Sequence, residues 1–334
     1  MGAPATGDGQ WRYAPPRWLR PGHINTVASF FWRRRVDLPA AEDVWLAVAP
    51  GVELLLRCHW QPRPAPALLL VHGLEGDSDV GYMRTTAAKA WRCGWHAVRM
   101  NVRGCGASEH ACATLYNSGL SGDLAQVVAW VLGQEPVRGL ALCGFSMGGN
   151  TVLKYLGEQG ENAPAGLMAA AAVSACLDLA ASAVALHRPA CRIYEARFLR
   201  RLRERVRRLE ARHPDGLPVA RLTEIRSIWQ FDDVIIAPRF GYRDAADYYD
   251  RASAARVAAG IARPTLVLHA EDDPFIVVTP PTRRVLAGNP NIRFLATRYG
   301  GHCAFLNPNH PGEDSFWAEN RVMDHCAAFV RQTP

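Results

Sequence analysis

Short apolar runs alternate along most of the chain with segments in which apolar residues recur every three or four positions. The run ALLLVHG at 67–73 is apolar throughout and ends at a glycine, as strands buried on both faces do, whereas 51–60 alternates like a half-buried strand. The same criteria predict strands over 96–104, 139–145, 167–174, 264–270 and 292–299, and helices over 81–92, 121–133, 147–159 and 315–332. Strands that alternate with helices predict an α/β fold with a mostly parallel central sheet flanked by helices.

The alternation breaks between about 180 and 255, where an arginine-rich amphipathic stretch leads into a segment rich in aromatic residues. An insertion between two consecutive strands of such a sheet is where a helical lid over an active site is expected. We therefore predict an N-terminal extension at 1–50, a first core part at 51–179, a lid at 180–255 and a second core part at 256–334.

The longest apolar tract, 167–186, is long enough to cross a membrane but has Asp178 in its middle. A charge at that depth is costly in lipid, so a buried strand followed by a loop explains the tract better.

Composition adds a charge pattern to this picture. The 334 residues are 49% hydrophobic, which allows a large core, and the formal net charge is +7. Ten arginines and three glutamates fall between Arg188 and Arg212, so the rest of the chain is about neutral. This basic segment has no recognised nucleic-acid-binding motif around it, and we expect no nucleic-acid partner.

Apolar residues recur at helical spacing within 192–210, with arginines between them. They are Phe198, Leu199, Leu202, Val206 and Leu209. Such a helix can lie on anionic lipid, but a lid helix that packs on the core and exposes its arginines is the commoner arrangement. We favour the packed helix and keep weak peripheral membrane contact as the alternative.

The nine cysteines include no C-x-x-C pair, and an odd count without framework spacing predicts reduced thiols in a cytoplasmic protein. The first residues contain no apolar stretch of the kind that begins a secretory signal. No His/Cys spacing typical of a zinc site is present, and we expect neither a metal nor an organic cofactor.

A serine stands between glycines in CGFSMGGN at 143–150, after a predicted strand and before a predicted helix. Gly144-Phe145-Ser146-Met147-Gly148 fits G-x-S-x-G, a sharp turn that lifts the serine hydroxyl above the sheet. The N-terminus of the following helix favours negative charge that develops near the serine. We predict that Ser146 is a nucleophile; the alternative is a tight turn with an incidental serine.

A serine hydroxyl needs a base, usually a histidine held by a carboxylate, and in this arrangement the chain order is serine, acid, histidine. His302 follows the last predicted strand after two glycines, which allow a loop back over the sheet. We predict that His302 is the base.

The acid is expected after the strand at 264–270, where Asp272 and Asp273 are adjacent. The usual turn places the acid three residues after a small residue, and Ala270 therefore selects Asp273, with Asp272 facing solvent or capping. Asp178, after the preceding strand, and Asp233, within the lid, remain alternatives.

An oxyanion site needs two backbone N–H donors. One is expected from Met147, next after the serine, and the second from Leu74 in the loop HGLEG at 72–76. His72 begins this loop, and we interpret it as a buried residue that holds the loop, because its strand precedes that of the serine.

Several segments together resemble the YheT-like α/β-hydrolases: RPGHINT, HGLEG, NVRGC, LYNSG with Asp123 soon after, GFSMGGN, FDD, DAADYYDRAS, HAEDDPF and GGHCAF. The resemblance covers about residues 15–330 and implies a carboxylesterase-like hydrolase with the triad Ser146, Asp273 and His302. Asn117 stands where a histidine is expected, and Cys303 lies where members vary, which weakens any transfer of substrate preference.

The sequence therefore predicts a serine hydrolase that cleaves carboxylic esters, with short- to medium-chain or lipid-like groups, through an acyl-enzyme on Ser146. A non-catalytic protein of the same fold that binds a ligand or partner is the second hypothesis.

Overall fold

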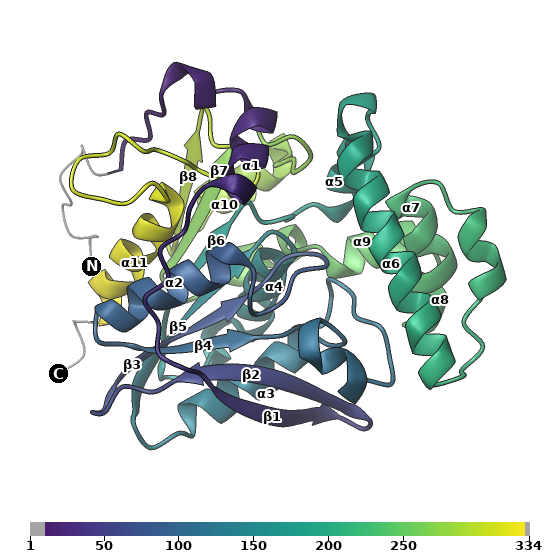
Figure 1. Ribbon diagram of the computed structural model, residues 1–334, viewed down its shortest axis with the longest axis horizontal. Helices are drawn as coiled ribbons and strands as arrows, with labels where there is room; N and C mark the ends of the chain where they lie inside the picture. Colours follow the sequence, from purple (N-terminus) through teal and green to yellow (C-terminus); the bar gives the residue numbers. More distant parts are fainter. Residues whose placement is uncertain (1–10, 331–334) are drawn as a thin grey trace.

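The computed structural model describes residues 11–330, and its centre is an eight-stranded sheet in the order β1-β2-β4-β3-β5-β6-β7-β8 (Figure 1). β1 pairs with β2 and β2 with β4 in antiparallel register, and every other neighbouring pair is parallel. The strands are β1 Glu42–Ala49, β2 Val52–His59, β3 Ala65–Val71, β4 His96–Met100, β5 Val137–Phe145, β6 Leu167–Val173, β7 Thr265–Ala270 and β8 Ile292–Thr297. The predicted mostly parallel α/β-hydrolase sheet is confirmed.

Helices cover both faces of the sheet, and a further group of helices lies to one side of it (Figure 1). They are α1 Gly22–Phe31, α2 Gly81–Arg92, α3 Ser121–Leu132, α4 Met147–Gln159, α5 Leu179–Leu186, α6 Arg192–Arg212, α7 Ile228–Phe231, α8 Ala237–Arg239, α9 Ala245–Ala252, α10 Pro280–Gly288 and α11 Trp317–Val330. A π-helical turn, Asp232–Ile236, joins α7 to α8, and short 3₁₀ turns include η1 Arg17–Leu19 and η2 Gly106–Ala111.

Two apolar cores, one on each face of the sheet, explain the continuous hydrophobic runs in the sequence. In β3, Leu69 and Val71 belong to the core shared with α3 and α4, while Leu68 and Leu70 belong to the core shared with α2 and α11. Successive side chains of a strand point to opposite faces, so a strand covered on both faces must be apolar at every position.

Three segments differ from the sequence-based expectation. The predicted extension 1–50 contributes strand β1, which pairs along β2 from Glu42 to Ala49. The stretch after β6, expected to be a loop, forms α5, whose first turn is capped by the Asp178 carboxylate accepting from Ala181 N at 3.0 Å. Helix α10 begins at consecutive prolines, which suit the first turn of a helix, but because of these prolines no helix was predicted there. The first ten residues of the predicted extension and the last four of the chain lie outside the described residues.

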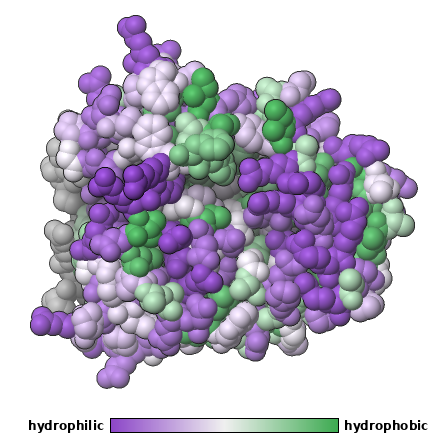
Figure 2. All heavy atoms as spheres, viewed as in Figure 1, coloured by the Kyte–Doolittle hydropathy of each residue, from purple (hydrophilic) through white to green (hydrophobic). Residues whose placement is uncertain are grey.

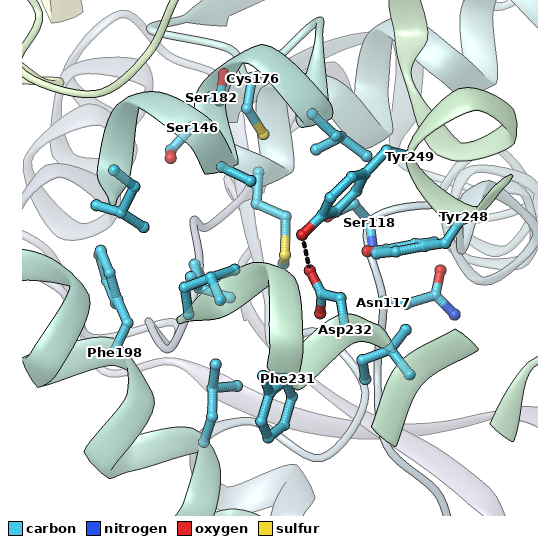
Figure 3. Close-up of a pocket in the computed structure, with 18 of the residues that line it drawn as sticks. Asn117, Ser118, Ser146, Cys176, Ser182, Phe198, Phe231, Asp232, Tyr248 and Tyr249 are labelled. Carbon is cyan, nitrogen blue, oxygen red and sulfur yellow. Dashed lines mark hydrogen bonds between the residues drawn. The ribbon is translucent and has the colours of Figure 1, made fainter. Parts of the chain in front are cut away.

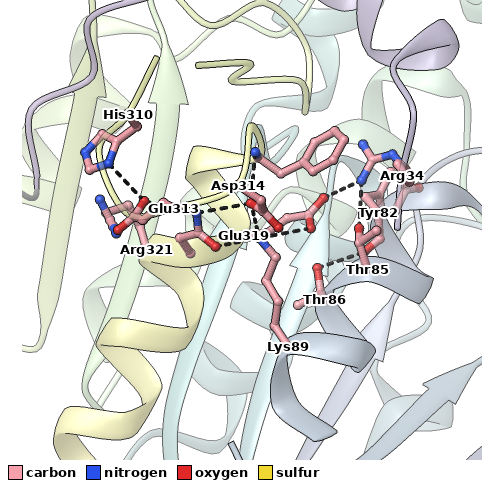
Figure 4. Close-up of polar contacts among 12 residues, drawn as sticks. Arg34, Tyr82, Thr85, Thr86, Lys89, His310, Glu313, Asp314, Glu319 and Arg321 are labelled. Atoms are coloured by element: carbon pink, nitrogen blue, oxygen red, sulfur yellow. Dashed lines mark hydrogen bonds and ion pairs between the residues drawn. The ribbon is translucent and has the colours of Figure 1, made fainter. Parts of the chain in front are cut away.

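A buried polar cluster ties the segment after α1 to α2 and α11 (Figure 4). Glu319 of α11 accepts from Arg34 at 2.6 Å, and Arg34 also donates to Thr85 of α2 at 2.7 Å. Lys89 of α2 lies 2.7 Å from the Asp314 carboxylate and 3.7 Å from that of Glu319. Lys89 and Glu319 are almost fully buried, and buried charges are stable only when paired, so the cluster fixes the N-terminal segment against α2 and α11.

Between β6 and β7 the chain forms α5 to α9, which lie beside the carboxyl ends of the parallel strands (Figure 1). Helix α6 is amphipathic: Leu199, Leu202, Val206 and Leu209 are buried, and the arginines of its opposite face make a hydrophilic surface (Figure 2). The apolar side of α6 therefore packs on the core, as favoured from the sequence. Among residues 11–330, no helix combines the length and apolar character needed to cross a membrane.

Candidate active site

Ser146 lies between the end of β5 and the start of α4, in a backbone conformation that few residues other than glycine adopt. Its φ is 55° and its ψ is −118°. The Ser146 amide donates to Val173 O of the neighbouring strand β6 at 2.9 Å, which anchors the turn to the sheet. A strained residue held by its surroundings is typical of a functional position.

Two glycines make this turn possible by leaving room for backbone on both sides. A Cβ at Gly144 would come within 2.2 Å of Gly148 O, and a Cβ at Gly148 would come within 2.4 Å of Val71 O in β3. The glycine pattern therefore reflects close backbone approach between the turn, α4 and β3.

Asp273 and His302 come together in the loops after β7 and β8. The His302 Nδ1–H donates to Asp273 Oδ2 at 2.9 Å, and the Asp273 side chain is fully buried. The other carboxylate oxygen, Oδ1, accepts from the backbone amides of Phe275 at 3.2 Å and Ile276 at 3.0 Å. These bonds hold Asp273 in one orientation, from which it orients the imidazole.

The surroundings of His302 set its basicity. Burial disfavours the charged imidazole, but the Cys303 sulfur and the Asp273 carboxylate outweigh that effect and hold the pKa of His302 well above its ordinary value. The Phe275 ring covers the imidazole, with 4.3 Å between ring centroids. The His302 imidazole is thus aligned by a carboxylate and shielded on one face.

Helix α1, in the predicted extension, supports both of these loops. The His302 amide donates to Thr26 Oγ1 at 2.8 Å, and a Cβ at Gly22 would overlap Asp272 O at 1.8 Å. The RPGHINT segment therefore packs directly on the Asp-His loops, a role that its sequence position did not reveal.

The loops of Ser146 and His302 meet at Val173, at the end of β6, and within residues 11–330 no side-chain hydrogen bond joins Ser146 to His302. The Ser146 amide and the Cys303 thiol both approach Val173 O, at 2.9 and 3.7 Å. Within residues 11–330 the Ser146 hydroxyl has no hydrogen-bond partner, and His302 Nε2 lies 3.7 Å from Cys303 Sγ. Contacts of this kind are often loose before substrate binds and close with it.

Leu74 and Met147 both line the pocket that contains Ser146. In the described part of the chain, neither backbone amide donates to another protein group. Free N–H groups beside a serine can stabilise an oxyanion. The loop that carries Leu74 is itself strained, because Glu75 has a φ of 55°.

Helix α6 holds the Leu74 loop through Glu75. The Glu75 carboxylate accepts from Arg205 Nε at 2.8 Å and Nη2 at 3.1 Å, and from the Tyr116 hydroxyl at 2.8 Å. Arg201 donates to the Glu75 carbonyl at 3.0 Å. Both side chains of the Glu75–Arg205 pair are more than 90% buried. Sequence analysis missed this contact, which spans 130 residues.

The remaining candidates from the sequence have structural roles. Asp178 caps α5, and Asp233 Oδ1 accepts from Ala245 N at 2.9 Å where α9 begins. Asp272 Oδ1 accepts from Gly301 N at 2.9 Å beside the His302 loop. His72 is fully buried, accepts from Val102 N at 3.0 Å, and has a pKa lowered to about 4 by burial. His72 therefore holds the loop as a neutral residue.

The pocket that contains Ser146 is partly open to solvent (Figure 3). Its lining is mostly apolar and comes from the core and from α5 to α9: Leu74, Tyr116, Asn117, Ser118, Ser146, Met147, Cys176, Leu179, Ser182, Ala183, Leu186, Phe198, Leu202, Ile228, Phe231, Asp232, Ile236, Tyr248, Tyr249, Phe275 and Ile276. A pocket with this lining suits an apolar small molecule.

Asn117, the position where a histidine was expected, lines this pocket and accepts from Gly119 N at 2.7 Å through its Oδ1. Sequence analysis did not assign Asp232 or Phe275 to the site. The FDD and HAEDDPF segments marked their neighbourhood, but no spacing rule indicates which side chain of a helical segment faces a pocket.

Comparison with known proteins identifies relatives of this chain. Residues 62–293 match the family model described as serine aminopeptidase, S33. Over 331 residues the chain is 31% identical to the esterase candidate YheT of Escherichia coli, covering 95% of this chain and 94% of that protein. It is 32% identical over 250 residues to a monoacylglycerol lipase of Saccharomyces cerevisiae, covering 72% of this chain and 55% of that protein.

Among solved structures, an esterase from Pyrococcus furiosus aligns with a TM-score of 0.58 at 15% identity, covering 89% of this chain and all but 1% of that one. At this identity the likeness shows a shared fold.

Proposed function

The chain belongs to the YheT-like family of α/β-hydrolases, and on that basis we propose that it hydrolyses carboxylic esters through an acyl-enzyme on Ser146. The observation that carries the proposal is the aligned Asp273–His302 pair beside a strained serine at an apolar pocket. Family members and structural neighbours named as esterases and lipases support ester hydrolysis as the reaction.

In the proposed reaction, His302 Nε2 takes the Ser146 hydroxyl proton while Oγ attacks the ester carbonyl carbon. The amides of Leu74 and Met147 stabilise the oxyanion, each by ~10²–10³-fold in rate. The C–O bond to the alcohol then breaks, and the alcohol leaves with the proton from His302. Water, deprotonated by His302, attacks the acyl-enzyme and releases the acid, while Asp273 keeps the imidazole in the required tautomer.

The pocket supports the substrate part of the proposal. The mostly apolar lining of the pocket suits a short- to medium-chain or lipid-like group of the ester. In this proposal α5 to α9 act as a lid, because they provide much of that lining. A chain-length series of p-nitrophenyl esters would show an optimum and a decline for chains longer than the pocket.

The serine is tested with a fluorophosphonate probe, which reacts with activated serines. We expect labelling of the wild-type protein and none of Ser146→Ala, with both variants folded by circular dichroism. A folded wild-type protein that resists the probe would favour the second hypothesis, a non-catalytic protein that binds a ligand or partner.

Contact with an anionic membrane surface is a second candidate function, carried by a different observation. The apolar face of α6 is buried, but large apolar side chains are exposed on α1 and at the start of α6, including Phe31 at 85% and Ile193 at 84%. Arg197 of α6 lies over the ring of Phe30, an exposed residue of α1, at 5.4 Å. Exposed apolar groups beside arginines suit anionic lipid.

Co-sedimentation with vesicles tests this candidate. The wild-type protein should pellet with phosphatidylserine vesicles more than with phosphatidylcholine vesicles, and less at high salt. The double variant Phe30→Ser, Phe31→Ser should lose pelleting. Trp45→Ser on β1, which removes an exposed aromatic elsewhere, is the control. Pelleting that is equal for the wild-type and double-variant proteins would contradict the contact.

A further inference from the structure

Asp232 is a carboxylate placed inside an otherwise apolar pocket. It directly follows α7 and begins the π-helical turn Asp232–Ile236, and its side chain lines the pocket together with Ser146. The adjacent Asp233 has a different task, since its Oδ1 accepts from Ala245 N and caps α9. Single π-helical turns are rare and occur frequently at functional sites.

No positive charge balances Asp232. It is the one acidic or basic side chain among the described residues that line the pocket, and it forms no ion pair with any residue in 11–330. Its one hydrogen bond in that range comes from the Tyr249 hydroxyl, which donates to Oδ2 at 2.6 Å. The second oxygen, Oδ1, accepts from no protein donor in that range.

Burial raises the pKa of Asp232 to about 7, although the bond from Tyr249 opposes the shift. The carboxyl is therefore partly protonated near neutral pH, where its neutral form can both donate and accept a hydrogen bond. A carboxyl in an apolar cavity is costly unless another group satisfies it.

We propose that Asp232, held by Tyr249, is a hydrogen-bonding subsite that binds an aliphatic hydroxyl group of the ester substrate. This inference rests on the proposed function, because it assumes that the pocket receives the ester cleaved at Ser146. In Figure 3 the Asp232 carboxylate and the Tyr249 hydroxyl meet on one side of the pocket, and Ser146 lies on the other. The substrate hydroxyl bound there therefore lies on the opposite side of the pocket from the ester carbonyl that Ser146 attacks.

Specificity arguments favour such a role. An apolar pocket discriminates weakly between chains that differ by one methylene, about 10–200-fold, whereas a site that hydrogen-bonds a hydroxyl strongly disfavours the analogue that lacks it. The nearby polar groups are neutral: the Tyr248 hydroxyl, which accepts from Ser118 N at 2.8 Å, and the Asn117 amide. An ammonium group would bring a second charge into this apolar site at a large desolvation cost. A hydroxyl fits these surroundings.

The test compares matched esters on matched variants. In the first pair of esters, one ester has an n-alkyl alcohol portion and the other has the ω-hydroxyalkyl counterpart. In the second pair, the acyl chain carries the same change. The two pairs together show whether the alcohol portion or the acyl portion reaches Asp232. For at least one pair, wild-type kcat/KM should favour the hydroxylated ester by about 10-fold or more, the discrimination that a hydrogen bond to a charged group provides.

Asp232→Leu should abolish or invert that preference, while Asp232→Asn, which keeps the shape and an accepting oxygen, should retain part of it. Asp233→Asn is the matched control and should keep the wild-type ratio. The ratio of two substrates on one variant is unaffected by a loss of folded protein, so the comparison holds even if Asp232→Leu is less stable.

Equal preference in wild type and Asp232→Leu for both pairs, or a preference for ω-ammonium over ω-hydroxy esters, would overturn the subsite. Failure of the proposed function is distinguishable, because the plain alkyl esters would then not be hydrolysed and Ser146 would not react with the fluorophosphonate probe.

Discussion

The conformation of Ser146 depends on neighbours that have no side chain. Holding a residue other than glycine in such a region of the backbone costs on the order of 1–3 kcal/mol, so the surrounding structure must enforce it. Gly148 allows α4 to begin against the carbonyls of Val71 and His72 in β3 and the loop after it. The serine and the following helix are thus positioned by contacts between backbones.

Gly148→Ala tests this dependence. The added methyl would come within 2.4 Å of Val71 O and 2.5 Å of His72 O, and backbone cannot easily move aside. We expect a loss of about 1–3 kcal/mol in the free energy of unfolding, measured with urea, and loss of fluorophosphonate labelling. Gly122→Ala in α3 is the control: no atom lies within 4 Å of the added methyl, and the variant should be as stable as the wild type or more so.

The raised pKa of His302 predicts how activity depends on pH. The base must be neutral to accept the Ser146 proton, so kcat/KM should rise with pH through a midpoint above the ordinary histidine value of 6.5. Because the folded-state pKa is the higher one, charged His302 stabilises the fold below pH 6.5, and this contribution is lost as pH rises through the folded-state pKa.

Replacing each carboxylate in turn distinguishes the roles of the adjacent residues Asp272 and Asp273. Asp273→Asn should lower the midpoint of the kcat/KM profile and reduce kcat by about 10⁴-fold, because the imidazole loses its orienting acceptor. Asp272→Asn should leave the midpoint in place, since that side chain contacts the Gly301 amide and not the imidazole. The opposite result would identify Asp272 as the orienting acid.

At the scale of elements, arginines of α6 pair with two carboxylates of the core, Glu75 and Glu109, and only Glu75 lies next to the site; Arg212 shares Glu109 with Arg208. Arg205 pairs with the buried Glu75 next to Leu74, whereas Arg208 pairs with Glu109 in η2, where the Arg208 side chain is 46% exposed. The first contact joins α6 to the loop whose amide we propose as an oxyanion donor. The second fastens the same helix away from the pocket.

Arg205→Met and Arg208→Met form a matched pair. The first leaves a buried carboxylate unpaired, which costs about 3–5 kcal/mol locally, and should lower kcat more than it changes KM, because oxyanion stabilisation acts in the transition state. The second should change stability by less than about 1 kcal/mol and leave kcat unchanged. Steady-state kinetics and urea unfolding measure both effects. Similar kcat and KM values for the two variants would contradict a role of the Arg205–Glu75 contact in oxyanion stabilisation.

For the whole molecule, the cores on the two faces of the sheet enclose most of the thiols. Seven of the nine cysteines are buried, Cys303 is half-buried and Cys93 is exposed. Burial also raises the pKa of the core thiols, as at Cys143 and Cys176, and keeps them protonated. The proposal of a reducing compartment, the cytoplasm, rests on this set of unpaired cysteines.

The rates at which the cysteine thiols react with a reagent in solution measure how well they are buried. In the native protein, a thiol reagent such as Ellman's reagent should modify Cys93 rapidly and Cys303 more slowly, and unfolding in guanidinium should expose all nine. Cys93→Ser should remove the fast phase. Rapid reaction of several thiols in the native protein would contradict the packing of the two cores.

The order of apolar runs determined the main course of the chain. Strands covered on both faces are apolar at every position, so β3, β5 and β6 were predicted within a few residues, as were α2, α3 and α4. β1 was missed because it lies at the edge of the sheet and most of its side chains are partly exposed. Helix α5 was missed because its alanine-rich continuation of β6 has no polar face to mark a period.

The sequence by itself predicted the strand order along the chain and the positions of Ser146, Asp273 and His302 after β5, β7 and β8, because motifs and hydrophobic period are local properties. Only the tertiary structure decided that Asp232 faces the pocket while Asp233 caps a helix, and that Arg205 of α6 reaches Glu75 across 130 residues. Such contacts depend on how α5 to α9 pack over the carboxyl ends of the strands. That packing is set by the buried surfaces of many residues together, and no short segment encodes it.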